Sequence, residues 1–377
     1  MKTNLIKGFR DFTGEEAEKR AEIKKILINI FERYGFEPAE TPIIEYQEFV
    51  KGSNQQDEVI SDIFRLRDKG KRNLALRYEF TFQLKRLIKN KKLPYKRYQI
   101  GEVFRDEPVS ANRFRQFIQC DVDIVGSTIK DEAEILSIAS EILKEIGIEG
   151  SIYVGNRKLI NEIIEKEEIK GDKEQILREI DKLECKCKFP KKEVINNLKK
   201  FKAEKLISIF EKPESYFKKY KAYEEIEELK EACGYYNLKL NFQPSLVRGL
   251  SYYTGNVFEI RSKNMRESIC GGGSYKIDGT QATGISFGLE RLSSLANIKC
   301  SKKKYLIWPN GKDKEAINIS KKLRNQEIIC DLIYKTNMKK VFDYANSKKF
   351  NKVIFYDKKS NKFKVKDMKT GKEKLIK

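Results

Sequence analysis

Residues 246–259, which read LVRGLSYYTGNVFE, place an arginine and two tyrosines between glycines. Glycine lets a backbone approach a ligand closely, and the residues after Gly255 have the composition of a strand. Tyr252 and Tyr253 could therefore present their hydroxyls to a ligand, although two neighbouring aromatic rings could also pack in a core. The chain contains no histidine, so no step of its chemistry can use an imidazole of its own.

A second polar pattern lies between residues 117 and 124. Gln119, Asp121 and Asp123 alternate with apolar residues, so a strand would present these polar side chains on one face. The apolar residues are Ile118, Cys120, Val122 and Ile124. The polar face would either line a cavity, where carboxylates could read a cationic ligand, or face solvent in an antiparallel sheet. Periodicity alone does not decide between these alternatives.

Three arginines suit phosphate recognition, because a guanidinium group is a planar fork that matches phosphate oxygens. Arg105, Arg113 and Arg115 lie on the two arms of one predicted hairpin. The glycine triplet at residues 271–273 predicts a turn instead. It matches neither a Walker loop nor a GxGxxG motif after a strand, which argues against those nucleotide sites.

These residues must be positioned by regular elements. Apolar residues at helical spacing predict two long helices, at residues 15–34 and 131–146, each followed by a glycine. An extended segment at residues 36–45 carries Pro42, which cannot donate to a sheet ladder and therefore belongs at an edge or an interface. Strand character is expected at residues 74–77, 97–105, 117–125 and 238–260.

The second half of the chain changes character twice. Between residues 156 and 235 the composition shifts to lysine, glutamate, isoleucine and leucine, which predicts a helical insertion. Residues 304–377 alternate strands and helices and indicate a small α/β domain with a mostly parallel sheet. The strands are expected at 305–308, 328–333 and 352–356, and the helices at 315–324 and 339–348.

Composition narrows the class of protein. The 377 residues suffice for two or three domains, and the net charge of +22 suits a polyanionic partner or reflects a lysine-rich proteome. The seven scattered cysteines indicate reduced thiols, and Cys185 and Cys187 have no second pair with which to bind zinc. We therefore expect no metal site, no membrane span and a cytoplasmic location.

Several segments fall in the order and spacing of the three motifs of class II aminoacyl-tRNA synthetases. They are Glu40-Thr41-Pro42 with Glu45, Phe104-Arg105-Asp106-Glu107 with Arg113 and Arg115, and GISFGLER at residues 284–291. Residues 246–259 closely resemble the signature of the histidyl-tRNA synthetases, as do GFRDF at 8–12 and LRYEFT at 76–81. QCDVDIVG at residues 119–126 resembles the archaeal and eukaryotic form of that family.

The resemblance covers most of the chain and is weakest in the insertion. It implies an α+β fold, with an antiparallel-sheet catalytic domain at residues 1–300 and an α/β anticodon-binding domain at 301–377. It also implies that ATP, with Mg²⁺, activates histidine to histidyl-adenylate, which is then transferred to the 3′ end of tRNA(His). Motif 1 implies a homodimer. Such chemistry rests on positioning and electrostatic stabilisation.

The same resemblance implies roles for the residues that would bind ATP. Arg105 would hold the α-phosphate and the substrate carboxylate, and Glu107 would read the adenine amino group. Arg113 and Arg291 would bind the distal phosphates. Arg248 would lie beside the α-phosphate, where the transition state gains charge. The catalytic residues implied in this way are Arg248 and Arg105.

The histidine site is implied by the resemblance as well. Glu79, Thr81 and Gln119 would receive the substrate ammonium. Asp123 and Tyr253 would bracket the imidazole nitrogens, one as an acceptor and the other as a hydroxyl. The full histidine-binding set is Glu79, Thr81, Gln119, Asp123, Arg248, Tyr252 and Tyr253.

The chain departs from the family pattern at several positions. Ser251 lies where aspartate is usual, and Ser274 where arginine is common. Tyr78 and Phe80 are bulkier than in the bacterial pattern, and Ile118 replaces a common histidine or aromatic residue. The segment after Ser274 is short, and the chain ends without an obvious last helix. These differences bear on fine tuning and on affinity for the anticodon end more than on the reaction.

Two other functions compete with a synthetase. A catalytically silent paralogue, such as the regulatory subunit of ATP phosphoribosyltransferase, would sense histidine without activating it. Such proteins tend to lose the arginine of the LVRGL segment and the C-terminal domain, whereas Arg105, Arg248 and Arg291 remain here. An RNA-binding module would explain the charge but not the ordered motifs.

Overall fold

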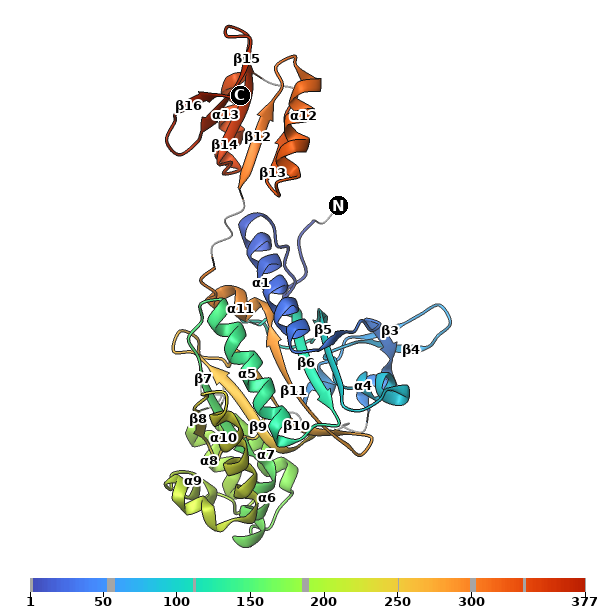
Figure 1. Cartoon of the computed structure of the whole chain (residues 1–377). Helices are drawn as coiled ribbons and strands as arrows, with labels where there is room; N and C mark the ends of the chain where they lie inside the picture. Colours follow the sequence, from blue (N-terminus) through green and yellow to red (C-terminus); the bar gives the residue numbers. More distant parts are fainter. Residues whose placement is uncertain are drawn as a thin grey trace. The chain divides into compact units, whose positions relative to one another are not determined.

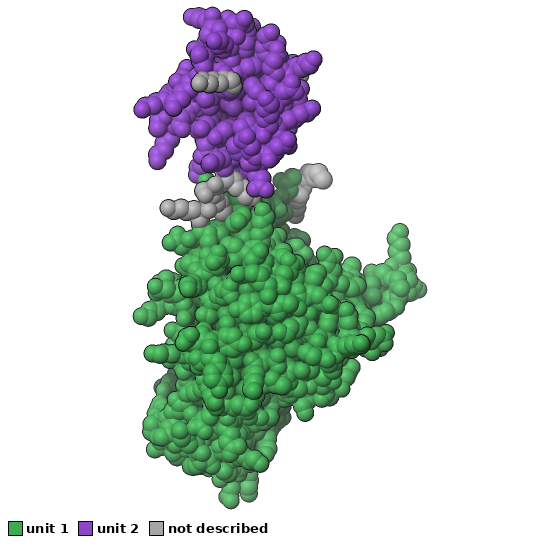
Figure 2. All heavy atoms as spheres, in the orientation of Figure 1, with its two compact units in different colours: residues 1–298 green, residues 299–377 purple. Residues whose placement is uncertain are grey.

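The computed structural model describes residues 3–52, 58–110, 113–184, 190–249, 251–298, 303–334 and 337–376. The chain forms two compact units, Met1–Ile298 and Lys299–Lys377, which Figure 2 shows in different colours. The predicted domain boundary between residues 300 and 301 lies outside the described residues, as do Cys185 and Cys187. None of the described helices is long and apolar enough to span a membrane.

An eight-stranded sheet forms the centre of the first unit, in the order β1-β5-β6-β11-β10-β9-β7-β8 (Figure 1). Its strands are β1 (Glu37–Pro38), β5 (Tyr95–Phe104), β6 (Gln116–Val125), β7 (Ser151–Asn156), β8 (Leu240–Phe242), β9 (Tyr253–Arg261), β10 (Cys270–Ile277) and β11 (Thr280–Gly288). The six central strands each pair antiparallel with their neighbours in the sheet. The edge strands pair in parallel, β1 with β5 and β8 with β7. The predicted antiparallel sheet is confirmed.

Three helices pack against one face of this sheet: α1 (Gly14–Arg33), α5 (Ile129–Glu145) and α11 (Leu289–Leu295) (Figure 1). Apolar residues at helical spacing on α5, such as Ile138 and Ile142, are fully buried in one cluster with Val122 and Ile124 of β6. Both long predicted helices are confirmed, close to their expected ends. They leave the opposite face of the sheet to the polar residues.

The predicted helical insertion is also confirmed. It consists of α6 (Arg157–Lys166), α7 (Lys173–Glu184), α8 (Lys191–Lys200), α9 (Lys205–Phe210), the short 3₁₀ helices η2 (Glu214–Lys219) and η3 (Lys221–Tyr223), and α10 (Glu224–Gly234). The last helix packs on α5, and its Ile226 and Leu229 belong to the same buried cluster. The insertion therefore extends the main core.

A smaller antiparallel sheet, in the order β2-β4-β3, precedes β5 in the chain. It consists of β2 (Ile44–Tyr46), β3 (Arg65–Arg67) and β4 (Asn73–Leu76), and the same part of the chain forms the short helices α2 (Gln47–Lys51), α3 (Glu58–Ser61), α4 (Leu84–Leu87) and η1 (Ile88–Asn90). Pro42 lies between β1 and β2 and belongs to neither strand, which suits a residue without a backbone N–H. Large apolar side chains are exposed here, namely Ile43, Ile44, Tyr46 and Leu66.

The second unit is an α/β domain, as the sequence predicted. Its elements are β12 (Lys304–Trp308), α12 (Asp313–Arg324), β13 (Ile329–Leu332), α13 (Met338–Ser347), β14 (Lys352–Asp357), β15 (Lys362–Asp367) and β16 (Glu373–Leu375). The sheet order is β13-β12-β14-β15-β16, in which the first three strands are parallel and the last two add antiparallel. The expectation of a mostly parallel sheet missed this terminal hairpin, because lysines mask the apolar alternation of β15.

The predicted turn at residues 271–273 was wrong. The glycine triplet lies inside β10, where its residues pair with Glu259–Val257 of β9 on one side and Ser286–Gly284 of β11 on the other. Glycine weakens a strand by itself, but two flanking ladders supply hydrogen bonds that outweigh that preference. Because glycine has no side chain, other groups can pack closely against this part of β10.

Candidate active site

The polar residues of β6 lie on the sheet face opposite the helical core. β6 pairs with β5 so that Asp123 lies opposite Arg97 and Asp121 lies opposite Gln99. Gln119 is 5% exposed, and the two aspartates are 3% and 4% exposed. The alternative of a solvent-facing strand was therefore wrong. These side chains form a polar surface in the interior of the protein.

Asp123 is held by side chains from two other strands. The Nη2 atom of Arg97 lies 2.9 Å from Oδ2 of Asp123, and the hydroxyl of Tyr275 on β10 donates to Oδ1. Burial raises the pKa of Asp123, and the charge of Arg97 opposes that rise. A Cβ atom at Gly284 would overlap Oδ1, so this glycine makes room for the carboxylate.

Glu79 and the tyrosine pair adjoin this surface. The hydroxyl of Tyr252 donates to Oε2 of Glu79 over 3.3 Å, and Thr81 hydrogen-bonds to Tyr252. Burial raises the pKa of Glu79 to about 8, although the charge of Arg105 opposes the rise. The ring centroids of Tyr252 and Tyr253 are 4.7 Å apart. The tyrosines thus pack together and also offer a hydroxyl to a carboxylate.

The loop between β5 and β6 carries the predicted arginine hairpin. Arg113 donates to Oε2 of Glu107 over 2.7 Å, and Oε1 of Glu107 lies 3.9 Å from Nη1 of Arg105. Glu107 therefore lies between two guanidinium groups. Arg115 instead pairs with Asp106 over 3.1 Å. Arg115 also donates to the main-chain carbonyl of Glu107 over 3.2 Å, so it holds the loop rather than the Glu107 carboxylate.

Gln119 connects the hairpin to the buried carboxylates. Its Oε1 atom accepts from Arg105 over 3.4 Å, and its Nε2 atom donates to Oδ2 of Asp121 over 2.8 Å. Burial raises the pKa of Asp121 to about 7, and the neighbouring Asp123 adds to the rise. Hydrogen bonds through Gln119 therefore connect the arginine hairpin to the buried aspartates of β6.

Arg248 lies in the loop before β9, with a φ angle of 61°. Few residues other than glycine adopt this left-handed conformation, and it concentrates at functional sites. The guanidinium group forms an ion pair with Glu259, whose second oxygen lies 2.9 Å from Nη2 of Arg261. A Cβ atom at Gly271 would overlap the guanidinium group of Arg248, so β10 leaves space for it.

Arg291, on α11, completes a cluster of arginines. It donates to the carbonyl of Ser268 over 2.8 Å. Burial lowers the pKa of Arg291 most, followed by the charge of Arg113, with smaller contributions from Arg248 and Arg105. Like charges lower a pKa only when they lie close together. Four predicted arginines from three segments therefore lie near enough for their charges to interact, and such a concentration of positive charge is suited to a polyphosphate.

The family model described as histidyl-tRNA synthetase matches residues 8–292, which is more than half of the chain. The chain belongs to the histidyl-tRNA synthetase family. Histidine--tRNA ligase 2 of Shouchella clausii is 31% identical over 98% of this chain and 97% of its own length. The histidine--tRNA ligase of Methanocaldococcus jannaschii is 33% identical over 98% and 96%. The chain is thus a ligase of the class II aminoacyl-tRNA synthetase type.

Solved structures agree on the fold. A histidyl-tRNA synthetase from Nostoc superposes with a TM-score of 0.83 at 22% identity, over 100% of this chain and 97% of its own. A protein from Bacillus halodurans, described as an ATP phosphoribosyltransferase regulatory subunit/histidyl-tRNA synthetase, has a TM-score of 0.75 at 21% identity, over 94% and 98%. The class II fold that the sequence predicted is confirmed.

Several residues of this synthetase-family site were not predicted from the sequence. Arg97 and Tyr275 hold Asp123, and Glu259 pairs with Arg248. Asp121 was part of the predicted polar face but was given no role. The alternation of β6 could have identified Asp121. The other partners come from neighbouring strands, and strand register was not evident from the sequence.

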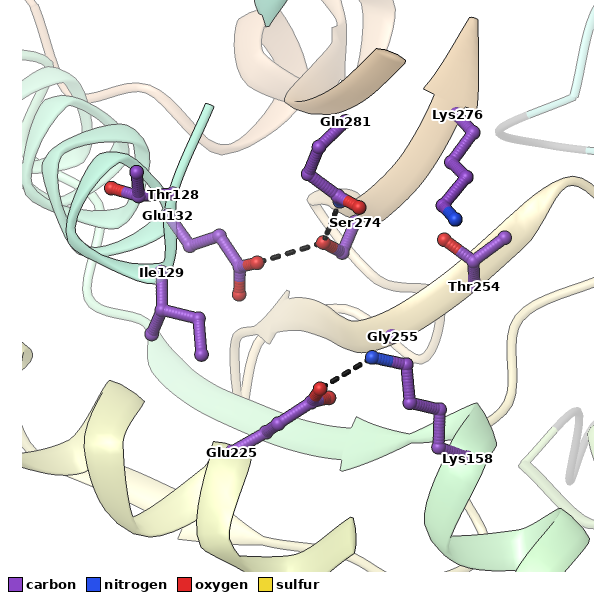
Figure 3. A pocket seen from close by; sticks show the side chains of 10 residues that line it. All are labelled: Thr128, Ile129, Glu132, Lys158, Glu225, Thr254, Gly255, Ser274, Lys276 and Gln281. Atoms are coloured by element: carbon purple, nitrogen blue, oxygen red, sulfur yellow. Dashed lines mark hydrogen bonds and ion pairs between the residues drawn. The ribbon is translucent and has the colours of Figure 1, made fainter. Parts of the chain in front are cut away.

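A separate cavity of about 390 Å³ lies on the side of the sheet that faces α5 and α10 (Figure 3). Ser274, one of the departures from the family pattern, lies here and donates to Oε1 of Glu132 over 2.8 Å. Gln281 in turn donates to Ser274, and Lys158 pairs with Glu225. Successive residues of β10 point to opposite faces, so Ser274 lies away from Asp123 and its tyrosine partner.

Proposed function

We propose that the chain is a cytoplasmic histidine–tRNA ligase that activates histidine with ATP and transfers it to the 3′ end of tRNA(His). One observation carries the proposal. The charges of four arginines interact with one another, and Gln119 connects one of them, Arg105, to the buried carboxylates of β6. A polyphosphate and an amino acid with a polar side chain would fit side by side in such a site. The printed names of the curated relatives support the assignment.

In the first step, an oxygen of the histidine carboxylate would attack the α-phosphorus of ATP. The bond from that phosphorus to the bridging oxygen would break, and pyrophosphate would leave. Arg105 would hold the α-phosphate and the carboxylate, while Arg248 would stabilise the charge that grows at phosphorus. Arg113 and Arg291 would bind the leaving phosphates, and Glu107 would read the adenine amino group. Rate enhancement would come from fixed positive charge and positioning.

Recognition of histidine would use the buried polar surface. Glu79, Thr81 and Gln119 would bind the substrate ammonium, and the positive charge of that ammonium would favour ionisation of the buried Glu79. Asp123 would accept a hydrogen bond from one imidazole nitrogen, and Tyr253 would offer its hydroxyl to the other. Buried polar groups that an analogue leaves unpaired reject it by about 10⁴–10⁵. The site could therefore be specific without an editing step.

In the second step, a hydroxyl of the terminal tRNA ribose would attack the carbonyl of the adenylate, and AMP would leave. The proton of that hydroxyl would pass to a phosphate oxygen of the leaving AMP, since the chain has no histidine to accept it. The second unit would bind the anticodon end of tRNA. Lysines and arginines greatly outnumber acidic residues in Lys299–Lys377, which suits a polyanion.

Mg²⁺ is expected with ATP, but the described part of the chain offers no group of three or more cysteine or acidic side chains placed to hold a metal ion. Mg²⁺ commonly keeps several waters and binds substrate phosphates with only one or two carboxylates. The phosphates of ATP would therefore be its main ligands. No step of the proposed reaction depends on a protein metal site.

We also propose a homodimer. The exposed apolar side chains near β2 and β3 lie next to the motif 1 segment, and an exposed apolar patch is characteristic of an interface. Tyr46 and Leu66 are 58% and 39% exposed, and their strands flank Leu74 of β4 on both sides. Light scattering should give the mass of two chains. A monomer at micromolar concentration would contradict the proposal.

The decisive experiment is pyrophosphate exchange by the purified protein with ATP, Mg²⁺ and each of the twenty amino acids, without tRNA. Exchange with histidine alone would establish both the first step and the specificity. Exchange with another amino acid would retain the reaction but contradict the roles of Asp123 and Tyr253. Charging of tRNA(His) with labelled histidine would then test the second step.

The alternative function is a histidine-sensing regulatory subunit of ATP phosphoribosyltransferase. The likeness to the Bacillus halodurans structure, whose description includes such a subunit, is the observation in its favour. The arginine cluster argues against it, because a sensor of histidine has no need to bind a polyphosphate. Histidine binding without any exchange would favour the sensor.

A further inference from the structure

Arg97 is the largest completely buried side chain in the described part of the protein. It lies on β5 opposite Asp123, and its Nη2 atom is 2.9 Å from Oδ2 of that residue. The same nitrogen donates to the carbonyl of Phe80 over 3.2 Å. A guanidinium group is costly to remove from water unless it is well paired. Its burial under the proposed histidine pocket therefore needs an explanation.

The surroundings of Arg97 contain several buried polar atoms that have no hydrogen-bond partner among the described residues. They are Nε and Nη1 of Arg97, Oε1 of Gln99 and Oδ1 of Asp121, whereas Oδ2 of Asp123 has only its ion pair with Arg97. All four residues lie on one face of β5 and β6, as two directly opposite pairs. Protein interiors leave few such atoms unpaired. Their concentration at one place indicates a buried polar layer directly beneath the proposed ligand site.

The two aspartates of β6 contact different side chains. Arg97 contacts Asp123, whereas the uncharged side chains of Gln119 and Ser286 hydrogen-bond to Asp121. A guanidinium group favours the ionised form of the carboxylate beside it. The charge of Arg97 lowers the pKa of both aspartates, but Arg97 forms an ion pair with Asp123, so this contact directly favours the ionised form of Asp123.

We propose that Arg97 determines amino-acid specificity by positioning Asp123 as the acceptor for a ring N–H. The inference rests on the proposed function and deepens it. Arg97 holds one carboxylate oxygen and Tyr275 donates to the other, so the carboxylate cannot rotate and its remaining lone pairs have a fixed direction. An azole ring supplies the N–H that this acceptor requires. A sulfur-containing or purely carbon ring of similar size supplies none, and it would leave the acceptor unpaired.

Histidine-dependent pyrophosphate exchange tests this role in the full-length protein. Arg97→Met removes the charge, and Arg97→Lys keeps the charge without the planar fork. Arg77→Met is the matched control, because Arg77 is also buried but donates to the carbonyls of Glu102 and Thr41. For each variant, the KM for histidine, the KM for ATP and the exchange rate with thienylalanine would be measured.

We expect Arg97→Met to raise the KM for histidine by about tenfold or more, with the KM for ATP changed by less than about threefold. Preference for histidine over thienylalanine should fall by a similar factor, and Arg97→Lys should recover part of it. Arg77→Met should change neither KM. Equal losses for both substrates, or an unchanged preference, would overturn the inference.

A double-mutant cycle with Asp123→Asn distinguishes an effect of Arg97 through Asp123 from a defect in folding. Arg97→Met alone leaves a buried carboxylate unpaired, whereas Arg97→Met with Asp123→Asn removes both charges. If Arg97 acts through Asp123, its loss should have little further effect on histidine preference in the Asp123→Asn background. Fully additive effects would contradict that route. Absence of histidine-dependent exchange in the unmodified protein would instead refute the proposed function, so the two failures are distinguishable.

Discussion

Arg248 combines a left-handed backbone with a pair of charged neighbours. Its φ angle of 61° costs on the order of 1 kcal/mol for a residue with a side chain, and Gly249 follows it. Glu259 holds the guanidinium group, and Gly271 leaves space for it. Three neighbouring segments therefore fix one cation in place. This is the arrangement that preorganised stabilisation of a developing charge requires.

Replacing Arg248 tests that role. We expect Arg248→Ala to lower the rate of histidine-dependent pyrophosphate exchange by about 10²–10³, the effect typical of one lost charge-stabilising donor. Thermal unfolding should change little, because Glu259 keeps its ion pair with Arg261 when Arg248 is removed. Arg33→Ala, which removes an exposed partner of Glu141, is the control and should retain full exchange. Unchanged exchange in Arg248→Ala would refute the mechanism.

Glu79 links the site to pH. Its pKa is about 8 in the folded chain, against an ordinary value of 4.5, chiefly because of burial. Between these values the folded state keeps a proton that the unfolded chain has lost, so the free energy of unfolding falls as pH rises through that window. Glu79→Gln removes this dependence. The free energy of unfolding of this variant, relative to that of the unmodified protein, should therefore rise by roughly 3 kcal/mol from about pH 5.5 to pH 8.5.

Urea unfolding at the two pH values measures the difference directly. A variant whose stability follows pH as steeply as the unmodified protein would show that Glu79 is ionised in both states. The sign is opposite to that of a salt-bridged carboxylate, whose contribution is lost as pH falls. The experiment therefore separates burial from ion pairing as the dominant influence on this residue.

The limits of prediction at this scale follow from strand pairing. Alternation in one strand identified Gln119 and Asp123, because side chains two apart share a face. It could not identify Arg97 or Tyr275, since a contact across strands depends on register, which neither strand encodes by itself. The roles given to Asp123 and Arg248 stay predictions until they are measured. The residues that contact them, namely Arg97, Tyr275 and Glu259, were identified only from the structure.

At the scale of elements, β10 shows why a run of glycines can be a strand. Gly271 faces the guanidinium group of Arg248, whereas Gly272 packs against the main chain of β11. A Cβ atom at Gly272 would lie 2.8 Å from Cα of Ile285. One glycine therefore makes space for a functional side chain, and the next allows two strands to pair closely.

Alanine substitutions distinguish these two uses of glycine. Gly271→Ala should move the end of a flexible arginine side chain, lowering pyrophosphate exchange by about tenfold or more with little loss of stability. Gly272→Ala meets rigid backbone and should destabilise the first unit by about 3 kcal/mol. Gly234→Ala, at the end of α10 with no atom within 4 Å of the new Cβ, is the control for both. Equal stability losses at the first two positions would contradict the distinction.

Elements with strong local patterns were predictable, and those set by their neighbours were not. The apolar spacing in α1 and α5 fixed both helices, because a face that must be buried recurs at every turn. The glycine strand β10 and the lysine-rich strand β15 lack such a pattern. Their ladders with adjacent strands hold them, so the sequence alone pointed to a turn or to nothing.

At the scale of the whole molecule, charge is divided unevenly between the two units. Most of the net charge of +22 lies in Lys299–Lys377, although this unit is much the smaller. The first unit contains the arginine cluster and the buried carboxylates, which suit small substrates. We therefore propose that amino-acid activation belongs to the first unit and that the phosphate backbone of tRNA is contacted largely by the second.

That division predicts separate effects on the two steps. Alanine would replace four exposed lysines of α12 and α13 in the second unit, namely Lys321, Lys322, Lys339 and Lys340. Each lysine that contacts a phosphate should contribute roughly one unit to the salt dependence of tRNA binding, so affinity should fall and its dependence on salt should flatten. Pyrophosphate exchange should not change, since it requires no tRNA.

The insertion offers a control of matched charge. Its helix α8 carries four exposed lysines, namely Lys191, Lys192, Lys199 and Lys200. Their replacement removes the same charge from the first unit, so a general loss of electrostatic attraction would weaken tRNA binding equally in both variants. We expect the larger loss from the second unit, measured as tRNA affinity across a salt series. An equal or larger loss of tRNA affinity in the α8 variant would contradict this prediction. It would indicate that tRNA contacts the insertion, because only lysines that contact phosphates change the salt dependence of binding.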